Sequence, residues 1–276
     1  MEIHSLKSNE FNLSVNEIDY QPTYDYSKIH RHTYFEIFLF EKAKGGKQII
    51  DFNTYEIKDK TLYIVAPNQV HLLKRLKNEN GIILQFTSEY LKTSIPSTPA
   101  NLLFALKANP KTKLTLIDYN TLLYSFQYLK KLYKSNEVYK NEKIAYFFSF
   151  TIFQILGVLQ NKSNDLKKDN LTFQFLLSAE NHFVKNRNIS EYARMLNISV
   201  TKLNKQIKKD LGKTPLQIIH ELLIVEIKRL IIIEQLSHKE ISNHLQFDSQ
   251  SSYNRFVNKQ LGCNPTELSK SLEIHK

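Results

Sequence analysis

Five side chains near the start of the chain could bind a metal ion or a small molecule. His30, His32, Tyr34 and Glu36 alternate, and His71 follows further along the chain. Alternate residues of a β-strand point to the same face, so the spacing predicts that the first four share one face of a strand. Imidazoles together with a carboxylate can bind iron, manganese or zinc. We interpret these residues as the lining of a ligand-binding pocket without a metal or other cofactor, and a bound metal is the alternative.

The last hundred residues contain an internal repeat. A shift of 50 places Asn204, Lys209, Leu211, Gly212 and Pro215 on Asn254, Lys259, Leu261, Gly262 and Pro265. Each copy predicts a short helix, a turn and a second helix, because apolar residues recur at helical spacing on both sides of a short polar break. This order of elements is that of a helix-turn-helix unit.

The second helix of each copy has a polar face suited to contact with DNA. At ~100° per residue this face lies opposite Leu203 and Ile207 in the first copy, and opposite Tyr253 and Val257 in the second. Short donors and cations are the residue types that meet phosphates and base edges. A solvated face is the alternative for one isolated helix, but the same polar set in two copies favours DNA. The predicted DNA-binding residues are Thr201, Lys202, Asn204, Lys205, Lys208, Lys209, Ser249, Gln250, Ser251, Asn254, Arg255 and Lys259.

Local signals predict where these helices begin and end. Ser190 is the expected N-cap of the first short helix, and Ser237 with Glu240 forms a capping box for its counterpart. Gly212 and Gly262 are expected to end the second helices in the left-handed conformation.

The segment between the two units predicts one continuous buried helix. Thr214–Glu234 is densely apolar. Twenty helical residues span about 30 Å, which is close to the roughly 34 Å between successive major-groove faces of B-DNA. Such a helix would hold each unit opposite a neighbouring groove.

Residues 28–92 predict short strands in an antiparallel barrel or sandwich. The expected strands are Thr33–Phe40, Lys47–Ile57, Thr61–Ala66, Val70–Leu76 and Ile82–Phe86. Residues 96–113 predict a connection, and the apolar spacing after about residue 118 predicts a helical hairpin. The hairpin is expected to pack on the barrel, and because its second helix is apolar nearly all round, a dimer interface is a further interpretation.

Composition limits the class of protein. The chain has 276 residues and one cysteine, Cys263, which excludes a disulfide framework and a multi-cysteine zinc site. The first residues form no apolar signal segment, and the longest nearly apolar run, Leu222–Ile233, is interrupted by charges. We therefore expect a cytoplasmic protein that does not cross a membrane. The net charge of +11 agrees with a polyanionic partner, although the basic excess is spread over the whole chain.

Residues 175–272 resemble the DNA-binding module of the AraC/XylS family of bacterial transcription regulators. The resemblance rests on Ala193–Ser199, Leu203–Lys209, Gly212–Pro215, Ser252–Lys259 and Gly262–Pro265. Gln246 departs from it, because a Gly is usual there. The resemblance implies two helix-turn-helix units joined by a long helix. It also implies a small cupin barrel as sensing domain, since such domains carry a pattern similar to His30, His32 and Glu36.

We therefore expect an α+β chain. A cupin-like sensing barrel would occupy residues 1–115, a dimerising helical hairpin 116–162, a linker 163–170 and an all-α DNA-binding domain 171–276. The predicted function is regulation of transcription by sequence-specific DNA binding in response to a small-molecule effector; the sequence leaves activator or repressor open, and activator is the expected class. Double-stranded DNA, the effector, RNA polymerase and a second copy of the chain are the expected partners. We expect no catalysis; the alternative is a cupin-type metal-dependent enzyme fused to a DNA-binding module, using the same His and Glu residues.

Overall fold

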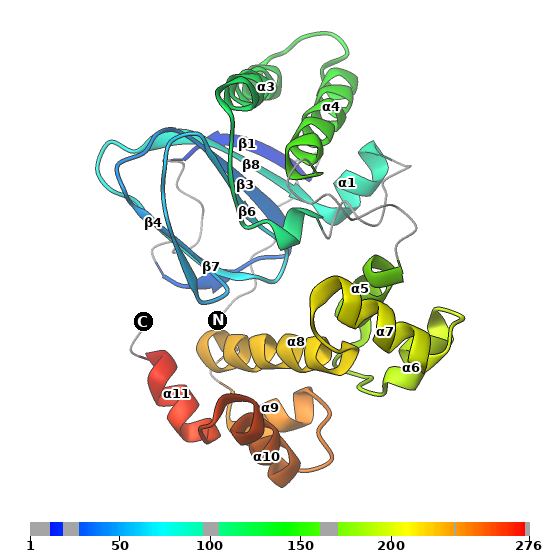
Figure 1. Cartoon of the computed structure of the whole chain (residues 1–276). Coiled ribbons are helices and arrows are strands. Elements are labelled where there is room, and N and C mark those ends of the chain that lie inside the picture. The colour runs from blue at the N-terminus through cyan, green and yellow to red at the C-terminus, as the bar shows by residue number, and fades with distance from the viewer. Residues whose placement is uncertain (1–11, 19–27, 96–104, 161–170, 235, 274–276) are drawn as a thin grey trace. The chain divides into compact units, whose positions relative to one another are not determined.

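The computed structural model describes residues 12–18, 28–95, 105–160, 171–234 and 236–273 (Figure 1). The chain divides into two compact units, Met1–Asp165 and Leu166–Lys276. The first unit combines two β-sheets with a helical hairpin, and the second is helical. The expected α+β composition, with sheets first and helices last, is confirmed.

The strands of the described residues form two antiparallel sheets. The five-stranded sheet has the order β1 (Leu13–Glu17), β8 (Asn80–Thr87), β3 (Tyr34–Lys42), β6 (Thr61–Val65) and β9 (Lys111–Lys113). The four-stranded sheet has the order β2 (His30–Arg31), β7 (Val70–Lys74), β4 (Lys47–Ile50) and β5 (Asn53–Glu56). No strand ladder joins the two sheets within the described residues, so the expected barrel is not closed.

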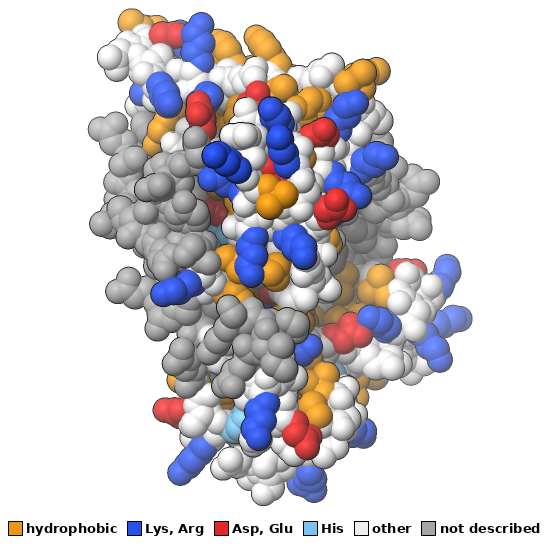
Figure 2. All heavy atoms as spheres, turned by 90° about the vertical axis from the view of Figure 1, so that its left-hand side faces the viewer, with side chains coloured by type: hydrophobic (Ala, Val, Ile, Leu, Met, Phe, Trp, Pro, Cys, Tyr) orange, Lys and Arg blue, Asp and Glu red, His pale blue; other side chains and the backbone are white. Residues whose placement is uncertain are grey.

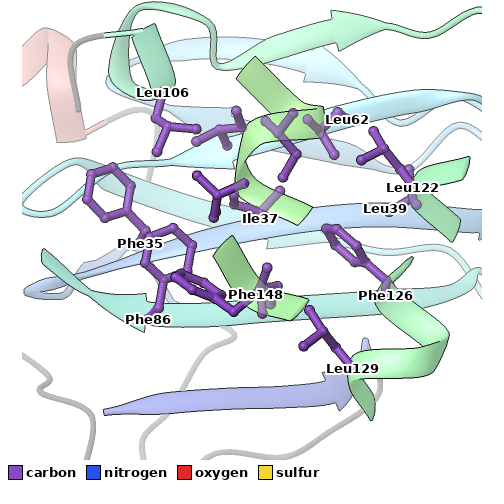
Figure 3. Close-up of a cluster of buried hydrophobic side chains, with 14 of the residues drawn as sticks. Phe35, Ile37, Leu39, Leu62, Phe86, Leu106, Leu122, Phe126, Leu129 and Phe148 are labelled. Carbon is purple, nitrogen blue, oxygen red and sulfur yellow. The ribbon is translucent and has the colours of Figure 1, made fainter. Parts of the chain in front are cut away.

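One face of the five-stranded sheet is covered by helices. Alternate residues of β3, namely Phe35, Ile37 and Leu39, belong to one buried cluster with residues of α1 (Ser88–Ser94), α3 (Leu116–Lys134) and α4 (Lys140–Gln160). Figure 3 shows these side chains beside Phe126 and Phe148 of the two long helices. Full burial of each large apolar side chain stabilises the fold by about 1.5–3 kcal/mol. The predicted helical hairpin is therefore present as α3 and α4, and it packs on the sheet.

The opposite face of the five-stranded sheet packs toward the four-stranded sheet. Phe38 and Phe40 of β3 share a second buried cluster with Ile50 of β4. Glu36 lies on the same face of β3 as Phe38, because side chains alternate along a strand. The space between the two sheets therefore holds the carboxylate that the sequence pattern singled out.

Two predicted segments of the first unit were wrong. Lys47–Ile57 was expected as one strand, but Asp51 and Phe52 take positive φ angles of 45° and 72° and turn the chain into a hairpin of β4 and β5. Part of the expected connection, Lys111–Lys113, pairs with β6 as an edge strand. Neither segment contains a Gly or Pro, so local sequence did not reveal them.

Helix α4 has two different faces. Ile144, Phe148 and Ile152 are fully buried against the sheet, whereas Tyr146 and Phe150 are exposed. By length and composition alone, Lys140–Leu159 is the one stretch of the described residues that could cross a membrane. Core helices of globular domains pass the same test, and the packing of α4 on the sheet is of that kind.

The second unit consists of α5 (Leu171–His182), α6 (Ile189–Met195), α7 (Val200–Leu211), α8 (Pro215–Arg229), α9 (His238–His244), α10 (Gln250–Leu261) and α11 (Pro265–Glu273). A short π-helix, η1 (Leu230–Glu234), follows α8. The connecting helix predicted over Thr214–Glu234 therefore begins as expected, with Thr214 as N-cap, but its last turn is wider than an α-helix.

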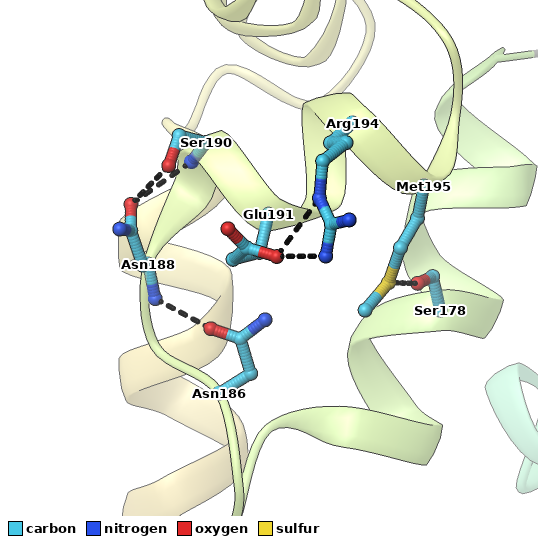
Figure 4. A network of polar contacts seen from close by, with 7 residues as sticks. All are labelled: Ser178, Asn186, Asn188, Ser190, Glu191, Arg194 and Met195. Carbon is cyan, nitrogen blue, oxygen red and sulfur yellow. Dashed lines mark hydrogen bonds and ion pairs between the residues drawn. The ribbon is translucent and has the colours of Figure 1, made fainter.

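The helix ends follow the predicted signals with one exception. Gly212 and Gly262 end α7 and α10 with φ angles of 68° and 71°, and Ser237 forms a capping box with Glu240. The predicted cap Ser190 is wrong: Asn188 is the N-cap of α6, because its Oδ1 accepts both the backbone N–H and the hydroxyl of Ser190. Figure 4 shows these contacts at the start of α6.

Candidate nucleic-acid interface and effector site

Helices α7 and α10 share the same amphipathic pattern. Each has twelve residues, begins after a serine N-cap and ends at a left-handed glycine. Leu203 and Ile207 are fully buried in α7, as are Tyr253 and Val257 in α10. The opposite face of each helix carries mostly exposed polar side chains.

The turns that lead into these helices are also related. Asn197 and Gln246 each take a φ angle of 54° directly after the preceding helix. The backbone N–H of the next residue returns to the carbonyl of Ala193 in the first turn and of Ser242 in the second, which is the hydrogen bond of a Schellman motif. The second turn is one residue longer, because three residues rather than two separate the C-cap of α9 from the N-cap of α10.

The predicted DNA-binding residues lie mostly on the exposed faces of α7 and α10. Asn204 is half-buried and donates to the carbonyl of Val200, and Ser249 is occupied as the N-cap of α10, where it accepts from the N–H of Ser252. The other ten are exposed: Thr201, Lys202, Lys205, Lys208, Lys209, Gln250, Ser251, Asn254, Arg255 and Lys259. Their contact with DNA stays a prediction.

Positive charge alone does not mark an interface. On the face drawn in Figure 2, Lys and Arg side chains are scattered among Asp and Glu rather than gathered in one patch. In α7, by contrast, four lysines share twelve residues with a single acidic side chain, Asp210. Asp210 accepts hydrogen bonds from Gln206 and Thr172 of its own unit, so it is held beside the buried side of the helix.

The predicted effector residues come together between the two sheets of the first unit. The expectation that the first four, from His30 to Glu36, share one strand is wrong. A bend at Thr33 lies between β2, which belongs to the four-stranded sheet, and β3, which belongs to the five-stranded sheet. His30 pairs with His71 of β7 across the four-stranded sheet. All five residues, His30, His32, Tyr34, Glu36 and His71, are buried.

Hydrogen bonds orient the imidazole rings toward Glu36. Nδ1 of His32 lies 2.8 Å from the carbonyl oxygen of Tyr34, and Nδ1 of His30 lies 2.8 Å from that of Lys28. A carbonyl only accepts, so Nδ1 carries the proton in both rings. His32 Nε2 then lies 3.2 Å from Oε2 of Glu36, and His71 Nε2 lies 3.5 Å from the same oxygen.

Electrostatics favour an ionised carboxylate in this cluster. Burial alone would raise the pKa of Glu36, but the neighbouring imidazoles of His32 and His71 and the amide of Gln85 outweigh it and lower the pKa to about 2. Burial lowers the pKa of His71 well below its usual value, and His30 and His32 act in the same direction against Glu36. At neutral pH the site therefore combines a carboxylate anion with a neutral imidazole.

This donor set fits a divalent transition metal as well as a polar ligand. The ligand atoms of His32, Glu36 and His71 lie within 4.8 Å of one another. Ligand atoms about 2.0–2.1 Å from a tetrahedral metal are about 3.3 Å apart, a separation close to those from Glu36 to the two histidines. An unprotonated nitrogen facing a carboxylate oxygen is repulsive unless a proton or a cation lies between them.

Two glutamines of this region were not predicted from the sequence. Gln85 of β8 donates to Oε1 of Glu36 at 2.7 Å. Gln48 of β4 is fully buried, and its amide oxygen and nitrogen both lack a hydrogen-bond partner among the described residues. Gln48 lies two residues from Ile50, which pairs with His71, so both face the space between the sheets. Only the strand register brings these glutamines to the site, and no spacing in the sequence indicates it.

Comparison with known proteins bears on the second unit most directly. Residues 192–271 match the family model described as a helix-turn-helix domain. The chain is 21% identical over 228 residues to the RCS-specific HTH-type transcriptional activator RclR of Escherichia coli (strain K12), covering 77% of this chain and 76% of that protein.

Solved structures of ToxT from Vibrio cholerae are similar along most of the chain. The unsaturated fatty acid-bound wild-type protein has a TM-score of 0.44 at 15% identity, covering 93% of this chain and 94% of that one. ToxT from Vibrio cholerae O395 has a TM-score of 0.43 at 17% identity, covering 95% of this chain and 98% of that one. The matched helix-turn-helix domain and the regulator relative support a DNA-binding transcription regulator, in agreement with the resemblance of this chain to the AraC family.

Proposed function

We propose that the protein activates transcription by reading two neighbouring segments of major groove, one with α7 and one with α10. The observation that carries the proposal is the repeated recognition helix: equal length, the same serine cap, the same glycine end and exposed polar residues opposite a buried pair. A serine cap and a left-handed glycine each favour a defined end to the helix. The curated relative is named as a transcriptional activator, which supports activation rather than repression.

The two helices would divide the work of recognition. Lysine is a mobile point charge, whereas arginine can grip O6 and N7 of guanine with two donors, and asparagine or glutamine can do the same with adenine. Arg255, Gln250 and Asn254 of α10 are therefore proposed to read bases. Lys202, Lys205, Lys208 and Lys209 of α7 are proposed to contact mainly phosphates, with Thr201, Ser251 and Lys259 beside them.

The first unit is proposed to sense a small molecule through a cupin-like pair of sheets. A ligand with both hydrogen-bond donor and acceptor groups would match the anionic Glu36, the neutral His71 and the unpaired amide of Gln48. The alternative of a cupin-type enzyme is not favoured, because the relative of known role is a regulator.

The helical hairpin is proposed to form a homodimer. Tyr124, Tyr146, Phe150 and Phe153 are half or more exposed on α3 and α4, and exposed aromatic patches of this kind mark protein interfaces. Dimerisation would place two DNA-binding units on one operator in the cytoplasm, where RNA polymerase is the further partner.

The experiment is selection of duplex DNA from a randomised library by the full-length protein, followed by measurement of affinity at two salt concentrations. The proposal predicts a bipartite consensus whose halves lie about one helical turn apart. Binding without any sequence preference, or a consensus with a single half, would contradict it.

A further inference from the structure

One arginine joins the two helix-turn-helix units of the DNA-binding domain. Arg187 lies in the loop before α6, and so belongs to the first helix-turn-helix unit. Its Nη2 donates to the backbone carbonyl of Leu245, the C-cap residue of α9 in the second helix-turn-helix unit. Its guanidinium carbon lies 3.9 Å from the centre of the Phe247 ring in the turn between α9 and α10.

Each of these contacts suits an arginine. The last carbonyls of a helix have no partner within the helix and carry partial negative charge, which a cation offsets. The flat guanidinium stacks on an aromatic ring, and the attraction increases where water is excluded. Nε of Arg187 is buried, and the carboxylate of Asp248 adds a favourable charge from the same turn.

Further contacts connect Phe247 with the first helix-turn-helix unit. The Phe247 ring lies 5.4 Å from Phe256 of α10, and Phe256 lies 5.1 Å from His220 of α8. Phe256 also packs against the buried cluster of the first helix-turn-helix unit, which includes Leu203 and Ile207 of α7. A chain of contacts thus runs from the first helix-turn-helix unit, through the turn between α9 and α10, to α10.

The internal repeat is broken at the residues that make this contact. The position of Arg187, directly before the N-cap of α6, corresponds to Leu236 before the N-cap of α9. Phe247 corresponds to Ile198, and Asp248 is the extra residue of the longer second turn. The first copy therefore has no equivalent of the ring or the carboxylate, and the second has no equivalent of the arginine.

We propose that Arg187 is a positioning residue that fixes the distance and rotation between α7 and α10, and thereby the spacing of the two DNA half-sites that the protein accepts. The proposal rests on the proposed function, in which both helices read DNA. A rigid pair of readers gains affinity because the second contact is made without a further loss of orientational freedom. The same rigidity penalises DNA whose half-sites are displaced, since each added base pair changes both their distance and their rotation.

The test uses the full-length protein and the bipartite site that the wild type selects from random duplex DNA. Affinity is measured for that site, for versions with one or two base pairs inserted or removed between the halves, and for a version with the second half scrambled. Arg187→Met keeps the apolar stem and removes the cation and the donor. The matched control is Arg194→Met, because Arg194 is exposed and pairs with Glu191 of its own helix (Figure 4).

For Arg187→Met we expect about tenfold weaker binding to the selected site, with binding to the scrambled version changed less than twofold. A tenfold loss corresponds to about 1.4 kcal/mol. The penalty for altered spacing should shrink at the same time, whereas Arg194→Met should keep the wild-type spacing preference. Phe247→Leu removes the other side of the contact and should broaden the spacing preference in the same way. If Arg187→Met is not folded by circular dichroism, Phe247→Leu decides.

Two results would overturn the proposal. The spacing preference of the folded variant could equal that of the wild type, or affinity could fall alike on every DNA, as for a residue that only supports the fold. If the wild type itself selects no bipartite site, the proposed function fails rather than the role of Arg187.

Discussion

Replacing Arg255 with alanine should separate base reading from phosphate binding. Arg255 is exposed on α10, and its side chain makes no hydrogen bond or ion pair within the described residues. Truncation therefore removes no contact that holds the domain together, and the loss should appear in binding alone. A bidentate contact with guanine contributes about 1–3 kcal/mol of discrimination, so affinity for the selected site should fall roughly 5- to 150-fold. Preference at one or two base pairs should relax.

Lys208→Ala on α7 provides the contrast. A lysine that neutralises one phosphate releases about one counterion, so its loss should lower the slope of log affinity against log salt by about one and weaken binding to all sequences alike. Lys270→Ala is a suitable control, because Lys270 is an exposed lysine of α11, outside both recognition helices; it should change neither quantity.

The assay is binding of each variant to a randomised-site library at two salt concentrations. If Arg255→Ala lowers affinity while base preference is unchanged, Arg255 is not a base reader. If Lys208→Ala alters preference and leaves the salt slope intact, the roles are reversed. Either outcome would refute the division of labour between the two helices.

Four further predictions follow from the structure. A fragment beginning near Asn170 should fold and bind DNA with marked salt sensitivity, because the second unit is compact by itself; a folded fragment without such binding in a gel-shift assay would contradict this. His32→Ala should change the regulatory response in a reporter assay, and elemental analysis that finds a stoichiometric metal only in the wild type would favour the metal alternative. Gln246→Gly should raise the free energy of unfolding of the second unit by about 1 kcal/mol, because its φ of 54° is unfavourable for a residue with a Cβ; Asn197→Gly should gain less in the same denaturant titration, because asparagine tolerates this conformation. Burial lowers the pKa of His238 below 6.5, so the unfolded chain binds its proton first and stability should fall as pH drops below about 6.5; in His238→Gln this loss should be smaller.

The sequence allowed α7 and α10 to be predicted because the signals that form these helices are local. Burial of Leu203 and Ile207 follows from their spacing, and the left-handed ends follow from Gly212 and Gly262. The repeat made the argument stronger, since two independent segments had to satisfy the same pattern. The cap at Asn188 was missed because Ser190, which sits inside the first turn, is an equally good capping residue by type.

Features that depend on contacts distant in sequence could not be predicted in this way. The hairpin at Asp51 and Phe52 contains no Gly or Pro, and is stabilised by pairing of β4 with both β5 and β7. Gln85 reaches Glu36 only because β8 and β3 are in register. The residues of the candidate effector site were therefore predicted as a set, while their hydrogen-bond partners and their division between two sheets required the structure.

The separation of the chain into two units constrains how an effector could regulate DNA binding. A ligand at Glu36 and His71 stabilises whichever state binds it more tightly, but it changes affinity for DNA only if that state also differs in its contact with DNA. A hundredfold change requires about 2.7 kcal/mol of such coupling. A dimer interface on α3 and α4 would provide it, because the buried faces of both helices pack on the sheet that carries Glu36. A ligand that shifts this sheet would then alter the pairing of two DNA-binding units, so ligand affinity should depend on protein concentration across the dimerisation range.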